Sequence, residues 1–246
     1  LEITVVLVAI TVPLSTCSAL LISVALSSIP KLKSLYQTIY FLPYVTNTLA
    51  VGLVFMILFK KTAYTDGLIN LLINRFGGAS VDFIDGPYWA KMFVLCFYTV
   101  WVVLPFKILI LTSALASVNR DYYNAAKVDG TSRTRIFTRI TVPLLSPMLA
   151  YVVITGFIGG FKEYTSIIGI FGESMGPADD AGRLNTMVGF IYDAMESNNQ
   201  GRASAAALIL FVIILAVTLI NLQVSKKSVH YCGVLWTALQ LCGSAI

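Results

Sequence analysis

Five apolar segments, each long enough to cross a bilayer, are the feature that most constrains how this chain can fold. A membrane-spanning helix needs about 20 predominantly apolar residues, and within hydrocarbon every backbone polar group must be bonded internally. Only 12% of the residues are charged, whereas soluble domains average about 25%. We therefore expect an all-α integral membrane protein with about five transmembrane helices. The segments are residues 1–29, 39–59, 88–116, 144–171 and 203–222.

The loops that carry lysine and arginine predict how the chain is oriented. Basic residues are enriched in cytoplasmic loops near the ends of spans. Here they follow the first, third and fifth segments, whereas most acidic residues lie in the other loops, together with some basic ones. The net charge of +5 is therefore assigned to cytoplasmic loops and not to nucleic-acid binding, and the chain should begin outside and end inside. The basic residues concerned are Lys31, Lys33, Arg120, Lys127, Arg133, Arg135, Arg139, Lys226 and Lys227.

Two short segments in the other loops have apolar residues at helical spacing. Leu68, Leu71 and Leu72 predict a short amphipathic helix on the outer membrane surface. The segment 186–195 shows the same spacing. The tail 229–246 is too short to cross a membrane, and two interpretations of it stay open: an interfacial segment, or a stretch foreign to the rest of the chain.

The longest polar interruption between two apolar segments, residues 124–147, predicts a helix–turn–helix elbow. Its first residues are rich in alanine, and Gly130 can adopt the left-handed conformation that ends a helix. Thr131 or Ser132 can cap a second helix by accepting a free backbone N–H. Apolar residues then fall on one face and arginines on another. We expect this elbow to lie against the membrane.

The spacing within this elbow resembles the EAA loop of ABC importer permeases, in the longer form found in sugar-importer permeases. That motif is Glu-Ala-Ala, three residues, Gly, nine residues, Ile, one residue, and usually Leu-Pro. Two positions depart from it, because Asn124 stands where the family usually has Glu and Val142 where it usually has Leu. The matching positions are Ala125, Ala126, Asp129, Gly130, Phe137, Ile140, Pro143 and Pro147.

The resemblance covers nearly the whole chain up to Lys227, and in the final third it favours MalF-like over MalG-like permeases. It implies a permease domain at residues 1–228 with a coupling loop at 117–143, and a six-helix core of which this chain lacks the first helix. The chain would then be a transmembrane subunit of an ATP-driven oligosaccharide importer in a bacterial inner membrane. The implied ATPase-coupling residues are Asn124, Ala125, Ala126, Asp129, Gly130, Phe137, Ile140 and Pro143.

The same resemblance implies several partners. They are a second, MalG-like permease, a homodimeric ATPase that binds ATP and magnesium, and an extracytoplasmic sugar-binding protein. The elbow would sit in a cleft of the ATPase and transmit its closure to the membrane helices. This chain itself has no G-x-x-x-x-G-K-[ST] motif, so ATP is expected to bind only to the partner.

Charged residues inside the apolar segments predict a polar pathway. Lys107, Lys162 and Glu163 each cost roughly a few kcal/mol at the bilayer centre, so they should face a cavity or one another. Glu163 is expected on one helical face with two glycines. In maltose-type permeases the sugar binds midway across the membrane, between the helices that flank the EAA loop. The resemblance therefore implies a translocation site at Thr99, Phe106, Gly156, Gly160 and Glu163. A purely structural pairing of Glu163 with Lys162, Lys107 or a residue of a partner subunit stays open.

Motifs for catalysis or metal binding are weak. Residues 172–176 match G-x-S-x-G, but a nucleophile elbow needs a histidine partner. The only histidine, His230, lies in the tail, on the opposite side of the predicted membrane. The four cysteines lack metal-ligand spacing. We expect no catalytic residue, no resident cofactor and no metal site.

Two alternative transporters stay open. Lys107 and Lys162 would suit an importer of glycerol phosphate or another small solute, whereas Glu163 and Phe106 suit a neutral sugar. An ion-coupled secondary transporter would use the same charges without partners. It has no use for a basic elbow, however, and no inverted repeat is visible.

Overall fold

The computed structural model describes residues 1–27, 29, 33–62, 66–172 and 184–228. In this part of the chain the regular structure is helical, apart from one isolated bridge between Lys61 and Asp66. The helices are α1 (Glu2–Ser27), α2 (Lys33–Val45), α3 (Thr48–Phe59), α4 (Leu68–Arg75), α5 (Tyr88–Ser117), α6 (Arg120–Val128), α7 (Arg133–Ile136), the π-helix η1 (Phe137–Thr141), α8 (Val142–Phe161), α9 (Thr165–Phe171), α10 (Met187–Glu196) and α11 (Gln200–Ser228).

Among the described residues, four helical stretches are long and apolar enough to cross a bilayer. A fifth crossing requires α2 and α3 to be taken together, since the two are bent by 98°. The expected all-α membrane architecture with about five spans is confirmed. The four long stretches are Glu2–Ser27, Tyr88–Ser117, Arg133–Phe161 and Gln200–Lys226.

The predicted span at residues 39–59 contains a break between α2 and α3 that the sequence did not reveal. The Thr46 hydroxyl donates to the carbonyls of Leu42 (3.2 Å) and Pro43 (2.8 Å), which satisfies acceptors at the end of α2. The Asn47 side chain accepts from the Leu49 N–H at 2.9 Å and caps α3. Two adjacent polar residues therefore end one helix and start the next, because their side chains bond the free backbone groups at both ends.

The predicted span at residues 144–171 also contains a break. Helix α8 ends at Phe161, and α9 starts at Thr165. The Glu163 carboxylate accepts a 3.0 Å hydrogen bond from the Ser166 N–H, one of the free donors at the start of α9. A carboxylate at a helix N-terminus is stabilised by both the hydrogen bond and the helix dipole. The break is thus built around the charged residue itself.

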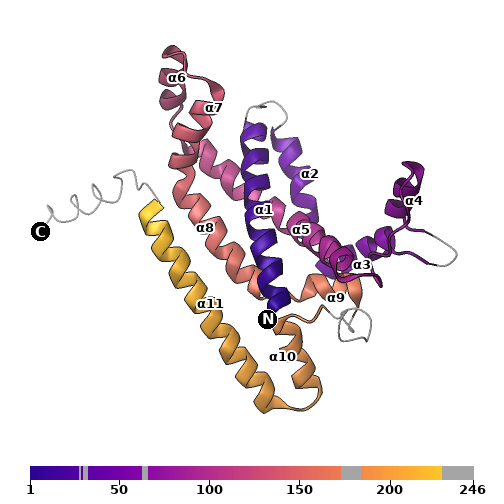
Figure 1. The fold of residues 1–246 in the computed structure, drawn as a ribbon. Helices are drawn as coiled ribbons and strands as arrows, with labels where there is room; N and C mark the ends of the chain where they lie inside the picture. Colours follow the sequence, from indigo (N-terminus) through magenta and orange to yellow (C-terminus); the bar gives the residue numbers. More distant parts are fainter. Residues whose placement is uncertain (28, 30–32, 63–65, 173–183, 229–246) are drawn as a thin grey trace, which may run out of the picture.

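The packing places α1 against both α5 and α8, while α11 lies along α8 and contacts α10 (Figure 1). The two short helices that follow the breaks, α3 and α9, cross at Gly52 and Gly169. A Cβ atom on Gly52 would stand 2.6 Å from the Gly169 backbone, so this crossing requires glycine. The Tyr98 hydroxyl donates to the Thr48 carbonyl at 2.6 Å and ties α5 to the start of α3.

The elements between the long helices divide between two ends of the molecule. Figure 1 shows α6 and α7 at one end and α9 and α10 at the other, while α4 projects sideways beyond α3. The two short helices predicted in the acidic loops are confirmed as α4 and α10. The last predicted span is longer than expected and forms α11. Residues 173–176 of the G-x-S-x-G match and the tail 229–246 lie outside the described residues.

Candidate functional site

One cavity brings together all five residues predicted for the substrate pathway. It has a volume of about 210 Å³ and lies between α1, α2, α5, α8 and the break after α8. Its walls are Thr11, Val12, Ser15, Tyr44, Thr99, Val102, Val103, Phe106, Lys107, Val152, Thr155, Gly156, Gly159, Gly160 and Glu163. Apolar lining with a few converging polar groups is typical of a small-molecule site.

Two aromatic rings form one wall of this cavity. Phe106 on α5 stacks on Tyr44 on α2, with ring centroids 5.5 Å apart and planes inclined by 14°. Sequence reasoning missed Tyr44, because it placed this residue inside a straight span instead of at the end of a broken one. A stacked aromatic surface suits the apolar face of a sugar ring.

The cavity is also lined by a hydroxyl, that of Thr99, which makes no hydrogen bond within the described residues. Thr99 is only 4% exposed, and its Oγ1 has no hydrogen-bond partner among the described residues. Its neighbours on the same face of α5, Val102, Val103 and Phe106, also line the cavity, as the helical spacing predicts. Buried polar atoms are nearly always bonded, so this hydroxyl is a candidate for contact with a bound molecule.

Glu163 reaches the cavity differently from the prediction. It does not continue the face of α8 that carries Gly156 and Gly160, because the helix ends before it. Within the described residues it forms no ion pair with Lys107 or Lys162, and Lys162 is exposed and off the cavity. A structural pairing of Glu163 with either lysine is therefore absent from the part of the chain that the structure describes.

Lys107 lines the same cavity. It is 5% exposed, and its Nζ donates to Ser15 Oγ at 2.7 Å and to Thr16 Oγ1 at 3.1 Å. Ser15 was also missed in the sequence. The signal that could have found it is the row of small polar residues at spacings of seven and four along α1, formed by Thr4, Thr11 and Ser15.

The two predicted glycines let α8 approach α1 and α5. A Cβ on Gly160 would stand 2.9 Å from Val8 Cγ2. A Cβ on Gly156 would stand 3.2 Å from Lys107 Nζ and 3.3 Å from Val12 Cγ1. Because these two residues are small, they allow the helices around the cavity to pack closely and also leave space within the cavity.

The predicted coupling segment forms a helix, a turn and a second helix. Asn119 caps α6 by accepting from the Asp121 N–H at 3.0 Å. Gly130 has φ +68, in the left-handed region, as expected. Hydrogen bonds from Gly130 N to Lys127 O (3.1 Å) and from Thr131 N to Ala126 O (2.9 Å) complete a Schellman motif. Ser132 precedes α7, but its side chain makes no capping hydrogen bond.

The residues of this segment differ in exposure. Ala126 is buried and Phe137, Ile140 and Pro143 are half-buried, whereas Asn124, Ala125, Asp129 and Gly130 are exposed. The predicted regular face of Phe137 and Ile140 is altered, because these residues lie in or beside the wider turn of η1. Helices α7, η1 and α8 follow one another without interruption, so the segment continues directly into the cavity wall.

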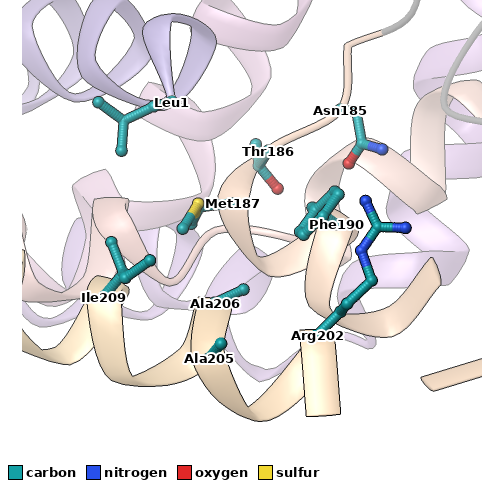
Figure 2. A pocket seen from close by; sticks show the side chains of 9 residues that line it. All are labelled: Leu1, Asn185, Thr186, Met187, Phe190, Arg202, Ala205, Ala206 and Ile209. Atoms are coloured by element: carbon teal, nitrogen blue, oxygen red, sulfur yellow. The ribbon is translucent and has the colours of Figure 1, made fainter. Parts of the chain in front are cut away.

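A larger cavity of about 500 Å³ lies between the start of α1, α10 and α11 and contains none of the predicted residues. Figure 2 shows Arg202 extending from α11 toward Phe190 and Asn185. The Asn185 Nδ2 donates to Asp193 Oδ2 at 2.7 Å. The walls are otherwise mostly apolar, so the smaller cavity, with its converging polar groups, is the better candidate. In the described residues no cluster of three or more His, Cys, Asp or Glu side chains could hold a metal.

Comparison with known protein families identifies the family of this chain. Residues 4–229 match the family described as binding-protein-dependent transport system inner membrane component. The chain belongs to this family. Membership confirms the predicted resemblance of the chain to ABC importer permeases, and together with the apolar helices it makes the chain a multi-pass protein of the bacterial inner membrane.

Individual members of the family support the same assignment. The arabinooligosaccharides transport system permease protein AraP of Halalkalibacterium halodurans is 28% identical over 201 residues, which are 81% of this chain and 61% of that protein. The lactose transport system permease protein LacF of Rhizobium radiobacter is 28% identical over 225 residues, 90% of this chain and 72% of that protein. The chain thus spans under two thirds of the length of the first relative.

A solved structure shares the fold. A chain of the bacterial alginate ABC transporter, in complex with an alginate pentasaccharide-bound periplasmic protein, superposes with a TM-score of 0.79. The match covers 92% of this chain and 77% of that chain at 19% identity. At this identity the comparison supports the arrangement of helices.

Proposed function

We propose that this permease is the transmembrane subunit of an ATP-driven importer of oligosaccharides and forms half of the translocation pathway. The observation that carries the proposal is the cavity between α1, α2, α5 and α8. It combines an aromatic wall, Tyr44 and Phe106, with the charged groups of Lys107 and Glu163 and with the Thr99 hydroxyl, which has no partner in the described part of the chain. A sugar ring has hydroxyl groups around its edge and one face that is more apolar than the other, so a sugar matches a cavity lined in this way.

The segment 117–143 is proposed to couple this cavity to a separate ATPase. Its exposed residues Asn124, Ala125, Asp129 and Gly130 would contact the ATPase, with Ala126, Phe137, Ile140 and Pro143 supporting them from behind. The uninterrupted helical stretch Arg133–Phe161 supports this role, because a stiff connection can carry a displacement to the glycines of the cavity. Asn124 would offer a neutral hydrogen bond where the family uses a carboxylate, and such a bond is weaker.

The partners follow from the same assignment. They are a second, MalG-like permease, an ATPase homodimer and an extracytoplasmic sugar-binding protein. ATP and magnesium would be bound by the ATPase, so this chain would have no enzymatic activity of its own. The cargoes named for relatives, arabinooligosaccharides and lactose among them, support a saccharide substrate.

The balance of charge argues against glycerol phosphate or another anion. Of the three charged residues predicted to lie within the membrane, Lys107 and Glu163 line the cavity, and Lys162 does not. One cation and one carboxylate leave the cavity without net charge, and this favours an uncharged polyhydroxyl compound over a phosphate dianion. If the chain were an ion-coupled secondary transporter, which works without an ATPase, the Schellman-capped turn of the coupling segment would have no role.

Uptake by the reconstituted complex tests the proposal. The chain would be assembled in proteoliposomes with the permease, ATPase and binding protein encoded beside it. Uptake of radiolabelled maltotriose, arabinotriose, lactose and glycerol 3-phosphate would then be measured with and without ATP. ATP-dependent accumulation of a saccharide is expected. Accumulation by this chain without ATP, or of glycerol 3-phosphate only, would contradict the proposal. A complex with an inactive ATPase subunit is the control.

A further inference from the structure

Lys107 is held in one orientation by two hydroxyls of α1. Its Nζ donates to Ser15 and to Thr16, at 2.7 and 3.1 Å. The hydrogens of both hydroxyls are already committed, since Ser15 Oγ donates to Thr11 O at 2.5 Å and Thr16 Oγ1 to Val12 O at 2.7 Å. The hydroxyls can therefore only accept from Lys107, and the ammonium group is fixed as the donor.

One N–H of this ammonium group remains. A lysine side chain has three donors, and the structure assigns acceptors to two of them among the described residues. Nζ packs against Gly156 of α8, where a Cβ would come within 3.2 Å of it, and the side chain lines the cavity. No described carboxylate pairs with Lys107. A buried donor without an acceptor is costly, so the remaining N–H is available to a polar molecule in the cavity.

We propose that Lys107 is a saccharide-binding residue, whose third N–H donates to a hydroxyl or ring oxygen of an uncharged sugar lying on Phe106 and Tyr44. This inference rests on the proposed function. Glu163 also lines the cavity, so the two side chains would act as one donor and one acceptor for hydroxyl groups. Small polyhydroxyl ligands are commonly oriented by a few such placed groups within an otherwise apolar pocket.

Transport kinetics of Lys107 variants test this inference. In Lys107→Met, which keeps the length of the side chain and removes its donors, KM for saccharide uptake should rise about tenfold or more, as expected when a hydrogen bond from a charged donor is lost. Lys107→Gln, which keeps a neutral donor, should show a smaller rise. The amount of assembled complex, measured by size-exclusion chromatography, should stay similar to wild type.

A matched variant distinguishes sugar binding by Lys107 from the hydrogen bonds that join Lys107 on α5 to α1. Thr16→Val removes one acceptor of Lys107, but Thr16 does not line the cavity. Its KM should rise clearly less than that of Lys107→Met, because Ser15 still holds the ammonium group and the third N–H remains. Equal rises in KM for Thr16→Val and Lys107→Met, or a wild-type KM in Lys107→Met, would overturn the inference. Absence of saccharide uptake in the wild-type complex would instead overturn the proposed function.

Discussion

At the scale of single residues, Thr99 is the most informative group in the cavity. Its hydroxyl is buried and has no partner among the described residues. Leaving such a group unbonded costs about 1–3 kcal/mol. A residue kept at this cost in the wall of a cavity is best explained by a ligand that satisfies it.

Replacing Thr99 by valine should weaken substrate binding without loss of stability. Valine has nearly the same shape and lacks the unbonded hydroxyl, so the Tm of the purified complex should be unchanged or higher. KM for saccharide uptake should rise about fivefold, in line with one lost neutral hydrogen bond. Thr112→Val is the control, since the Thr112 hydroxyl is bonded to Ile108 O at 2.6 Å on the same helix, outside the cavity. A lower Tm with unchanged KM in Thr99→Val would contradict the assignment.

How much of the site could be predicted depended on the integrity of each helix. Thr99 and Phe106 lie on α5, which continues unbroken for 30 residues, so counting along one face of this helix is enough to bring both to the wall of the same cavity. Tyr44 lies at the end of a broken helix, and its position depends on its stacking with another helix. Glu163 reaches the cavity from a turn. Contacts between helices and positions beyond a break have no periodic signal in the sequence.

At the scale of elements, the two helix breaks and the crossing of α3 and α9 belong together. At the start of each short helix a side chain accepts a hydrogen bond from a free backbone N–H. The side chain is that of Asn47 at α3 and that of Glu163 at α9. The breaks turn the chain so that Gly52 and Gly169 meet backbone to backbone. Apolar runs of 20 or more residues conceal such breaks, because hydropathy is insensitive to whether a polar residue bonds forward or backward along the chain.

The Gly52→Ala substitution should destabilise the chain. The added Cβ would stand 2.6 Å from the Gly169 backbone, which cannot rotate away, so α3 and α9 would have to separate. Overpacking of this kind typically costs about 1–3 kcal/mol, seen as a lower Tm in thermal denaturation of the purified protein. Gly201→Ala in α11 is the matched control, because nothing lies within 4 Å of the added atom. A wild-type Tm for Gly52→Ala would contradict the close crossing.

At the scale of the whole molecule, the proposed coupling segment and the cavity lie on one continuous helical stretch. Arg133–Phe161 runs from the turn at Gly130 to the glycines of the cavity. From residue 133 to residue 160 this is about 40 Å at 1.5 Å per residue. Figure 1 shows α6 and α7 at the end of the molecule opposite α10. A displacement at that end can therefore reach the cavity through a single element.

The most direct test of coupling is substrate-stimulated ATP hydrolysis by the assembled complex, with two substitutions at Gly130. Gly130→Pro cannot adopt φ +68 and removes the N–H that bonds Lys127 O, whereas asparagine tolerates the left-handed region. We predict that the proline variant assembles but loses stimulation by binding protein and saccharide, and that the asparagine variant retains most of it. Full stimulation in an assembled Gly130→Pro complex would contradict coupling through this segment.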